Sequence, residues 1–91
     1  MASNFQIYSF KTKSCLHLKL AGDFDGSSAY ELINKISEHA KRFYVIFIDT
    51  TNLNSIHPFG RDVFQKRFGD LKKQFHNIIF IGNNGHEIYS D

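Results

Sequence analysis

Apolar and polar residues alternate along the first part of the chain in a way that predicts two strands. Residues 5–10 are mostly aromatic or β-branched, and residues 15–21 place leucines at every second position with polar or basic residues between them. Period-two alternation is typical of a strand with one buried face and one exposed face. Because only the polar segment 11–14 separates the two strands, we expect an antiparallel hairpin.

A helical pattern follows this hairpin. Residues 22–26, rich in glycine and aspartate, predict a loop. Beyond them, apolar side chains recur at helical spacing, which predicts a helix with one stripe facing a core. The stripe consists of Ala29, Leu32, Ile33, Ile36 and Ala40. Ser28 and Glu31 have the spacing of a capping box, so we expect Ser28 to cap this first helix.

The rest of the chain repeats the order of strand and helix. Residues 43–48 form an unbroken apolar run, which is typical of a strand covered on both faces. Residues 50–57 are mostly polar and predict a connection. Pro58 suits the first turn of a second helix, because proline lacks the N–H that would be unpaired there. A second short apolar run, residues 78–81, predicts the last strand.

The predicted element order, β-β-α-β-α-β, indicates an α/β fold with a largely parallel sheet. The second helix would pack through a strongly aromatic inner stripe. That stripe consists of Phe59, Val63, Phe64, Phe68, Leu71 and Phe75. A chain of 91 residues has the length of one domain. We expect a single domain over residues 1–91, with its core in residues 5–82 and a tail in residues 83–91.

Charge and composition exclude several classes of protein. The formal net charge is only +2 and the basic residues are spread along the chain, whereas nucleic-acid-binding proteins usually carry a basic stripe. No apolar run approaches the length of a membrane span, and the N-terminal residues lack the apolar core of a signal peptide. The single cysteine, Cys15, cannot form an intramolecular disulfide. We therefore expect a cytoplasmic protein that binds neither nucleic acid nor membrane.

Three stretches carry a recognisable order and spacing. Leu18–Asp25 is an apolar strand that runs into Gly and Asp, Val45–Asp49 is a strand that ends in Asp, and a loop before a helix closes on Gly60. Together they resemble the STAS domain family, which takes its name from sulfate transporters and anti-sigma factor antagonists. Members bind protein partners, often anti-sigma kinases, and some are thought to bind nucleotides. The resemblance implies a STAS-like α/β fold and a non-catalytic regulatory role without a cofactor.

The sequence departs from this family at the start of the second helix. There the family has an acidic residue, a serine that is phosphorylated in some members, and a small residue before the glycine. Here these positions hold His57, Pro58 and Phe59. Pro58 has no hydroxyl group, so it cannot accept a phosphate. Within residues 83–91, the family's final helix is expected to be missing or shortened.

The turn that opens the second helix is the best candidate for a partner-binding surface. A helix N-terminus offers free amides and the positive end of its dipole, which favour anions and partner carboxylates. Exposed side chains beside it would complete the surface. The candidate residues are Asp25, Ser55, His57, Pro58, Phe59, Gly60 and Asp62. In the competing interpretation, Phe59 belongs to the core and His57 only caps the helix.

Other functions remain open from the same region. Loops around Asp23, Asp49 and His57 would suit a receptor for a small ligand or nucleotide, because ligands collect at the ends of parallel strands. Ser55 could accept a phosphate near the helix start. Asp23 and Asp49 with Asp25 could approach a divalent ion, but such a site needs more converging oxygen ligands, so no metal is expected.

Catalysis is not expected from this sequence. Ser55, His57 and Asp62 are the only nearby set with catalytic side chains. They show neither the residue order of a known triad nor a nucleophile elbow. We therefore predict a binding protein rather than an enzyme.

The aromatic content favours a homodimer. The chain contains ten Phe and four Tyr, and the apolar strand faces exceed what two helices are expected to cover. The residues concerned are Phe5, Ile7, Phe43, Val45 and Phe47. Large exposed apolar patches usually mark an interface. In the alternative, the hairpin and the tail close the gap.

Overall fold

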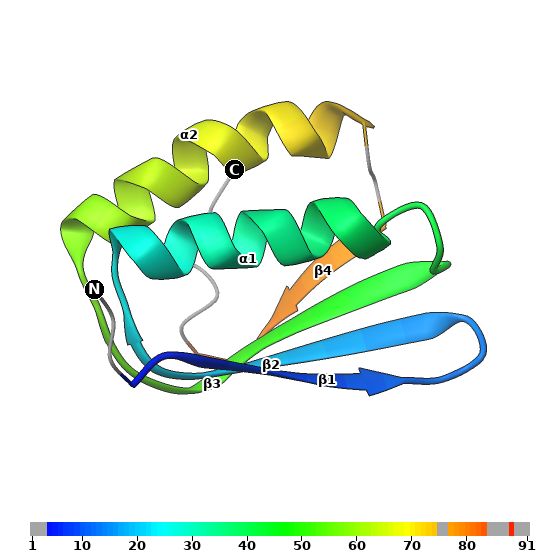
Figure 1. Ribbon diagram of the computed structural model, residues 1–91, viewed down its shortest axis with the longest axis horizontal. Coiled ribbons are helices and arrows are strands. Elements are labelled where there is room, and N and C mark those ends of the chain that lie inside the picture. The colour runs from blue at the N-terminus through cyan, green and yellow to red at the C-terminus, as the bar shows by residue number, and fades with distance from the viewer. Residues whose placement is uncertain (1–3, 75–76, 84–87, 89–91) are drawn as a thin grey trace.

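Both helices lie on one face of a four-stranded sheet (Figure 1). The computed structural model describes residues 4–74, 77–83 and 88. Its elements are β1 (Gln6–Lys11), β2 (Cys15–Phe24), α1 (Gly26–His39), β3 (Val45–Ile56), α2 (Pro58–Gln74) and β4 (Ile78–Ile81). The sheet order is β1-β2-β3-β4, with β1 antiparallel to β2 and the other pairs parallel. The predicted element order and the α/β fold are therefore confirmed.

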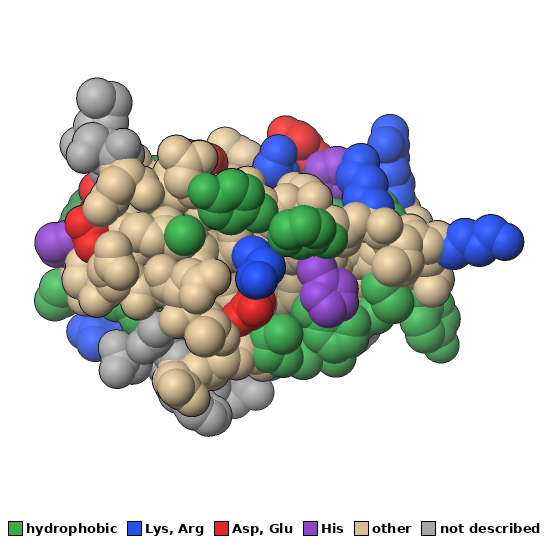
Figure 2. Space-filling model, turned by 90° about the horizontal axis from the view of Figure 1, so that it is seen from below, with side chains coloured by type: hydrophobic (Ala, Val, Ile, Leu, Met, Phe, Trp, Pro, Cys, Tyr) green, Lys and Arg blue, Asp and Glu red, His purple; other side chains and the backbone are tan. Residues whose placement is uncertain are grey.

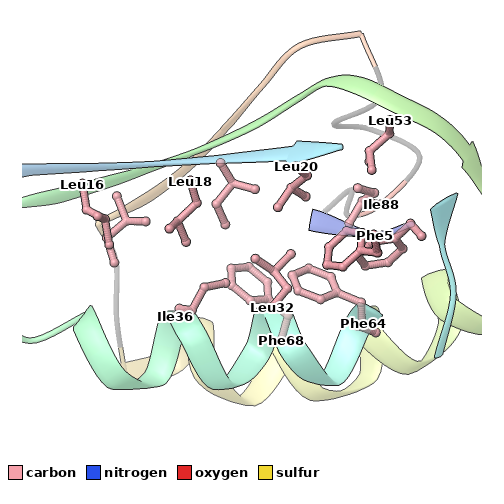
Figure 3. Close-up of a cluster of buried hydrophobic side chains, with 14 of the residues drawn as sticks. Phe5, Leu16, Leu18, Leu20, Leu32, Ile36, Leu53, Phe64, Phe68 and Ile88 are labelled. Atoms are coloured by element: carbon pink, nitrogen blue, oxygen red, sulfur yellow. The ribbon is translucent and has the colours of Figure 1, made fainter. Parts of the chain in front are cut away.

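The core lies between the sheet and the two helices. The leucines that alternate along β2, Leu16, Leu18 and Leu20, are fully buried. Apolar side chains of the helices, such as Leu32 and Phe68, point toward them from the opposite layer (Figure 3). Burying one such side chain contributes roughly 1.5–3 kcal/mol. The predicted alternation in β2 therefore decides which face of the sheet the helices cover.

Residues from near both ends of the chain complete the core. Phe5 precedes β1 and Ile88 follows β4, and their side chains are 6% and 0% exposed. The ring of Phe5 meets that of Phe24 edge-on, with the ring centroids 5.9 Å apart. The predictions for Phe75 and for most of the tail 83–91, including its missing or shortened helix, fall outside the described residues.

β2 and β3 run further than the sequence predicts. The predicted loop 22–26 and the predicted connection 50–57 are wrong over most of their length, because β2 continues to Phe24 and β3 to Ile56. These two ends pair with each other through two shifts of register. Each segment alone has the composition of a loop, but each supplies backbone hydrogen-bond partners to the other.

The apolar run 43–48 is not covered on both faces, contrary to the prediction. Ile46 and Ile48 are fully buried beneath the helices. Val45 and Phe47 alternate with them and are only partly buried on the other side of the sheet. A run without alternation therefore does not by itself show that both faces of a strand are covered.

The other face of the sheet carries no described helix, and we call it the open face. Two rows of side chains cross it in register, one residue from each strand. The aromatic row is Phe10, His17, Phe47 and Ile79, and the charged row is Tyr8, Lys19, Asp49 and Ile81. Figure 2 looks onto this face and shows hydrophobic side chains on both sides of a basic, an acidic and a histidine side chain. The open face therefore combines apolar edges with a charged centre.

The predicted surplus of apolar strand surface lies partly on the open face, although Tyr30, Tyr44 and Phe59 are also exposed elsewhere. Phe5, which was predicted to lie beyond the reach of the helices, is buried. Ile7 and Phe43, predicted likewise, pack partly against the core. Of the five residues in that prediction, only Val45 and Phe47 lie on the open face.

Candidate functional site

The parallel pairing of β2 and β3 brings the starts of both helices together. The last residues of the two strands, Phe24 and Ile56, are partners across the sheet. The amide of His57 donates a hydrogen bond to the carbonyl of Phe24 at 2.8 Å, which ties the turn before α2 to the end of β2. Loops at the carboxyl ends of parallel strands are where α/β proteins commonly bind ligands. We call this region the helix-start site.

Asp25 caps α1, whereas the capping-box spacing predicts Ser28. The Oδ1 atom of Asp25 accepts hydrogen bonds from the amide and the hydroxyl of Ser28, both at 3.0 Å. Ser28 is buried within α1, and its hydroxyl also lies 3.1 Å from the carbonyl oxygen of Asp23. The amide hydrogen bond from Ser28 is the main cause that lowers the pKa of Asp25 below the usual 3.8, although partial burial opposes it. Asp25 is therefore an ionised cap.

α2 begins at Pro58, as predicted, and its first turn displays an aromatic side chain. The carbonyl of His57 accepts a hydrogen bond from the amide of Arg61 at 3.0 Å. Proline has no backbone N–H, but the first residue of a helix needs none for the hydrogen bonds within the helix. Phe59 is 70% exposed, and its predicted place in the inner stripe is wrong. Phe64, later in the same stripe, is fully buried.

Two glycines allow the helix starts to touch. A Cβ atom on Gly60 would lie 2.5 Å from the carbonyl carbon of Asp25, which is closer than real Cβ contacts. A Cβ atom on Gly26 would lie 2.7 Å from the ring of Phe59, so this ring rests against the first turn of α1. The two first turns therefore form one continuous surface, from which Phe59 protrudes.

Ser55 and Asp62 flank this surface in different settings. Ser55 donates its hydroxyl to Oδ1 of Asp23 at 2.7 Å, and Asn4 donates to the other carboxylate oxygen at 3.2 Å. Asp62 is exposed, with its Oδ1 3.7 Å from Nε of Arg61. Exposed ion pairs of this kind contribute little to stability. Ser55 is thus held by a carboxylate, whereas Asp62 is available to a partner.

The structure does not bring together the three carboxylates considered as an ion site. Asp49 lies well before the end of β3 and on the open face, because the strand continues to Ile56. Its Oδ1 accepts from the hydroxyl of Thr51 at 2.6 Å and from the amide of Thr51 at 2.9 Å. The hydroxyl hydrogen bond is the main cause of the lowered pKa of Asp49. In the described part of the chain, no group of three His, Cys, Asp or Glu could hold a metal ion.

Ser55, His57 and Asp62 do not form a catalytic relay. The hydroxyl of Ser55 donates to Asp23 at 2.7 Å, so in the described structure it is not directed to His57, the imidazole that a Ser-His-Asp relay would use. No enclosed pocket lies among residues 4–74, 77–83 and 88. Neither of the described helices is both long and apolar enough to cross a membrane. The helix-start site is therefore an exposed surface.

Sequence reasoning anticipated the open face only in part, because it predicted surplus apolar strand surface but assigned only Val45 and Phe47 correctly to this side of the sheet. At its edges, Tyr8 is 51% exposed, Phe10 56% and Ile79 45%. The alternation along β2 carries part of the signal, because it marks one side of that strand as polar. Which residues of β1 and β4 share that side depends on the register of the sheet, and the sequence does not state the register.

Two solved structures share this fold. One is an uncharacterized protein of the DUF3478 family with a SpoIIAA-like fold from Shewanella loihica, at 18% identity and a TM-score of 0.63, covering 96% of this chain and 75% of that chain. The other is the anti-sigma factor antagonist SpoIIAA in its unphosphorylated form, at 17% identity and a TM-score of 0.60, covering 93% of this chain and 80% of that chain. No protein-family model and no curated protein matches the chain. The chain therefore has the STAS-like, SpoIIAA-like fold that its sequence predicts.

Proposed function

We propose that this chain is a non-catalytic regulatory module in the cytoplasm, and that a protein partner binds its helix-start site. One observation carries the proposal: Phe59 is an aromatic side chain, 70% exposed, held between the starts of two helices. Aromatic residues dominate the binding energy of many interfaces. Phe59 would enter an apolar pocket of the partner as the anchor of the complex.

The surroundings of Phe59 support this role. Pro58 restricts the backbone next to it, and its ring rests against the backbone of Gly26, so little side-chain freedom is lost on binding. His57 and Asp62 are exposed on either side of it in the sequence. They would form a polar rim around the anchor, as is typical of protein interfaces.

The fold supports a regulatory partner. One protein of the same fold is an anti-sigma factor antagonist, and we propose a partner of the corresponding kind, an anti-sigma factor or a kinase-like protein. Since Pro58 offers no hydroxyl group, phosphorylation at that position cannot switch the complex. The interaction is proposed to be constitutive in this respect.

The alternatives receive less support from the geometry. A phosphate on Ser55 would lie against the carboxylate of Asp23, to which the hydroxyl now donates at 2.7 Å, and like charges at this distance repel. A small-ligand or nucleotide receptor usually has a concave pocket, and none lies among the described residues. Protein binding is therefore the function that the helix-start site supports best.

The test compares two exposed aromatic residues. Wild-type, Phe59→Ala and Tyr44→Ala baits capture partners from an extract of the source organism, and the affinity of the purified partner is then measured by calorimetry. Tyr44 is the matched control, because it is 84% exposed and lies before β3 at the other end of that strand. We expect Phe59→Ala to weaken binding by roughly 30-fold, the equivalent of a 2 kcal/mol anchor, and Tyr44→Ala to leave it unchanged.

Equal binding by the wild type and Phe59→Ala would contradict the proposal. Thermal shifts with nucleotides, and intact mass after treatment with a Ser/Thr kinase, test the alternatives directly. A nucleotide-induced shift without any protein partner would favour the receptor. An added phosphate on Ser55 that changes partner binding would favour the phosphoacceptor.

A further inference from the structure

The open face is self-complementary in its charges. Lys19 on β2 and Asp49 on β3 are partners in register at the centre of the sheet. Their charges cancel, so the charged row has no net charge that would repel a second copy of itself. Oδ1 of Asp49 accepts two hydrogen bonds from Thr51, and the charges of the nearby Lys19 and His17 also act on this carboxylate. The other carboxylate oxygen takes no part in these two hydrogen bonds and can accept one from a cation above the sheet.

The apolar edges of the open face are complementary as well. The edge formed by β1 carries the aromatic Tyr8 and Phe10, and the edge formed by β4 carries the aliphatic Ile79 and Ile81. Members of each pair occupy the same two rows, the charged row and the aromatic row. Consider a two-fold axis that lies above the open face, runs parallel to the strands and passes over the gap between β2 and β3. A rotation of 180° about this axis would place each β1 over the β4 of the other copy.

The same rotation aligns every position of the two rows. Lys19 faces Asp49 of the second copy, and Phe10 faces Ile79 of the second copy. Each contact occurs twice, as an isologous two-fold interface requires. Face-to-face sheets pack with their strands nearly aligned, so this arrangement is an ordinary one for two sheets. A single two-fold rotation therefore pairs the apolar edges of the two copies with each other and pairs Lys19 with Asp49 at the centre.

We propose that the open face binds a second copy of this chain, in a face-to-face homodimer with its two-fold axis parallel to β2 and β3. Four strands at ~4.8 Å spacing, and six residues at ~3.3 Å rise, give a footprint of ~400 Å² per copy. The total of ~800 Å² is below that of a standard stable interface. The dimer is accordingly weak and depends on protein concentration.

Sedimentation equilibrium over low-micromolar to millimolar concentrations tests the dimer. The weight-average mass of the wild type is expected to rise from 10.5 kDa toward twice that value. A Phe59→Ala variant is expected to behave in the same way, because Phe59 belongs to the helix-start site. Failure of the partner-binding proposal would thus leave this result untouched. A wild type that stays monomeric at every concentration overturns the homodimer and leaves the open face to a different partner.

A pair of charge variants tests the axis. Phe10→Glu and Ile79→Lys change two exposed positions, and each alone would bury an unpaired charge in the interface. Each variant alone is expected to weaken the dimer at least ~10-fold. An equimolar mixture is expected to form a heterodimer, because the two new charges face each other across the axis. A dimer unaffected by either variant, or a mixture that stays monomeric, overturns the proposed arrangement.

A measurement on the wild type keeps the test independent of folding defects. Amide chemical shifts recorded during dilution are expected to change along the aromatic and charged rows and to stay constant at the starts of α1 and α2. Shift changes confined to the helices would overturn the proposal.

Lys19→Glu is a further variant that tests the charged row. It would place a glutamate opposite Asp49 of the second copy, and the repulsion between these acidic side chains is expected to abolish the dilution-dependent shifts.

Discussion

The two faces of the sheet share the same strands but differ in chemistry. Along β2, Leu16 and Leu18 are fully buried against the helices, whereas His17 between them lies on the open face. The backbone hydrogen bonds lie in the plane of the sheet and are common to both faces. The two faces therefore differ only in the surroundings of their side chains. On the covered face, side chains pack against other side chains of the same domain. The comparison teaches that a strand can stabilise the fold with one side and remain available for recognition with the other.

The largest expected effect comes from the covered face. Leu18→Ala removes an isopropyl group from a fully buried position and should lower the free energy of unfolding by about 2–5 kcal/mol. Lys19→Ala, one residue further along the same strand, should change it by less than about 0.5 kcal/mol. Urea denaturation at low protein concentration measures both values. Comparable losses from both variants would show that the two faces are not distinct in energy.

The next largest effect concerns how closely the helices pack over the covered face. Gly60→Ala would place a methyl group 2.5–2.7 Å from backbone atoms of Asp25, which should cost about 1–3 kcal/mol. Gly69 is the matched control in the same helix, because a Cβ there meets nothing within 4 Å. Gly69→Ala should raise stability by about 1 kcal/mol. If Gly60→Ala proved neutral in thermal unfolding, the close approach of the helix starts would be refuted.

A smaller effect is expected at the cap of α1, and it depends on pH. Asp25→Ala should lower stability by about 1 kcal/mol at neutral pH. The pKa of Asp25 in the folded state lies below 3.8, so its charge stabilises the fold. This contribution is complete above pH 3.8 and is lost as the pH falls through the lower folded pKa. The difference in the free energy of unfolding between the wild type and Asp25→Ala should therefore become smaller as the pH falls, which urea denaturation at several pH values would measure.

Asp62→Ala is the control for this pH dependence, because Asp62 is an exposed acid that lies beyond the first turn of α2 and pairs only with the exposed Arg61 among the described ion pairs. Its unfolding curves should follow those of the wild type across the same pH range. If the difference in the free energy of unfolding between the wild type and Asp25→Ala became larger in acid, Asp25 would not act as an ionised cap.

The smallest effect on stability is expected from the open face. Phe10 is 56% exposed on the edge strand, and Phe10→Thr keeps a residue that suits a strand. At low protein concentration, the change in the free energy of unfolding should stay within about 0.5 kcal/mol. A much larger loss would mean that Phe10 supports the monomer, and the contrast between the two faces would then be weaker than the burial suggests.

Local patterns predicted the elements well where a single segment carries the whole signal. The leucines of β2 alternate because one side of that strand meets the helices, and Pro58 starts α2 because its backbone suits the first turn. The cap of α1 was assigned to Ser28, but Asp25 performs it. Both residue types cap helices well, so sequence spacing alone did not separate them.

The candidate site was predicted only in part. The turn at His57 and Pro58 was identified correctly as the start of a helix, and the contact between the helix starts places Asp25 beside Gly60. Asp49 was expected near the same edge and lies elsewhere, because a polar segment continues β3. The end of β3 has the composition of a loop, so its sequence does not indicate a strand. It is a strand because it pairs with the end of β2, which lies about 30 residues away in the sequence, and not because of its own strand propensity.

The sequence by itself determined the order of the elements, the apolar side of β2, and the absence of a hydroxyl group at Pro58. Each of these follows from residues that are close together or from the chemistry of one side chain. Only the tertiary structure decided that Phe59 is exposed and that the open face joins residues from four strands. Register and layer packing bring together residues that are distant along the chain, and no local pattern encodes which side of a sheet is left uncovered.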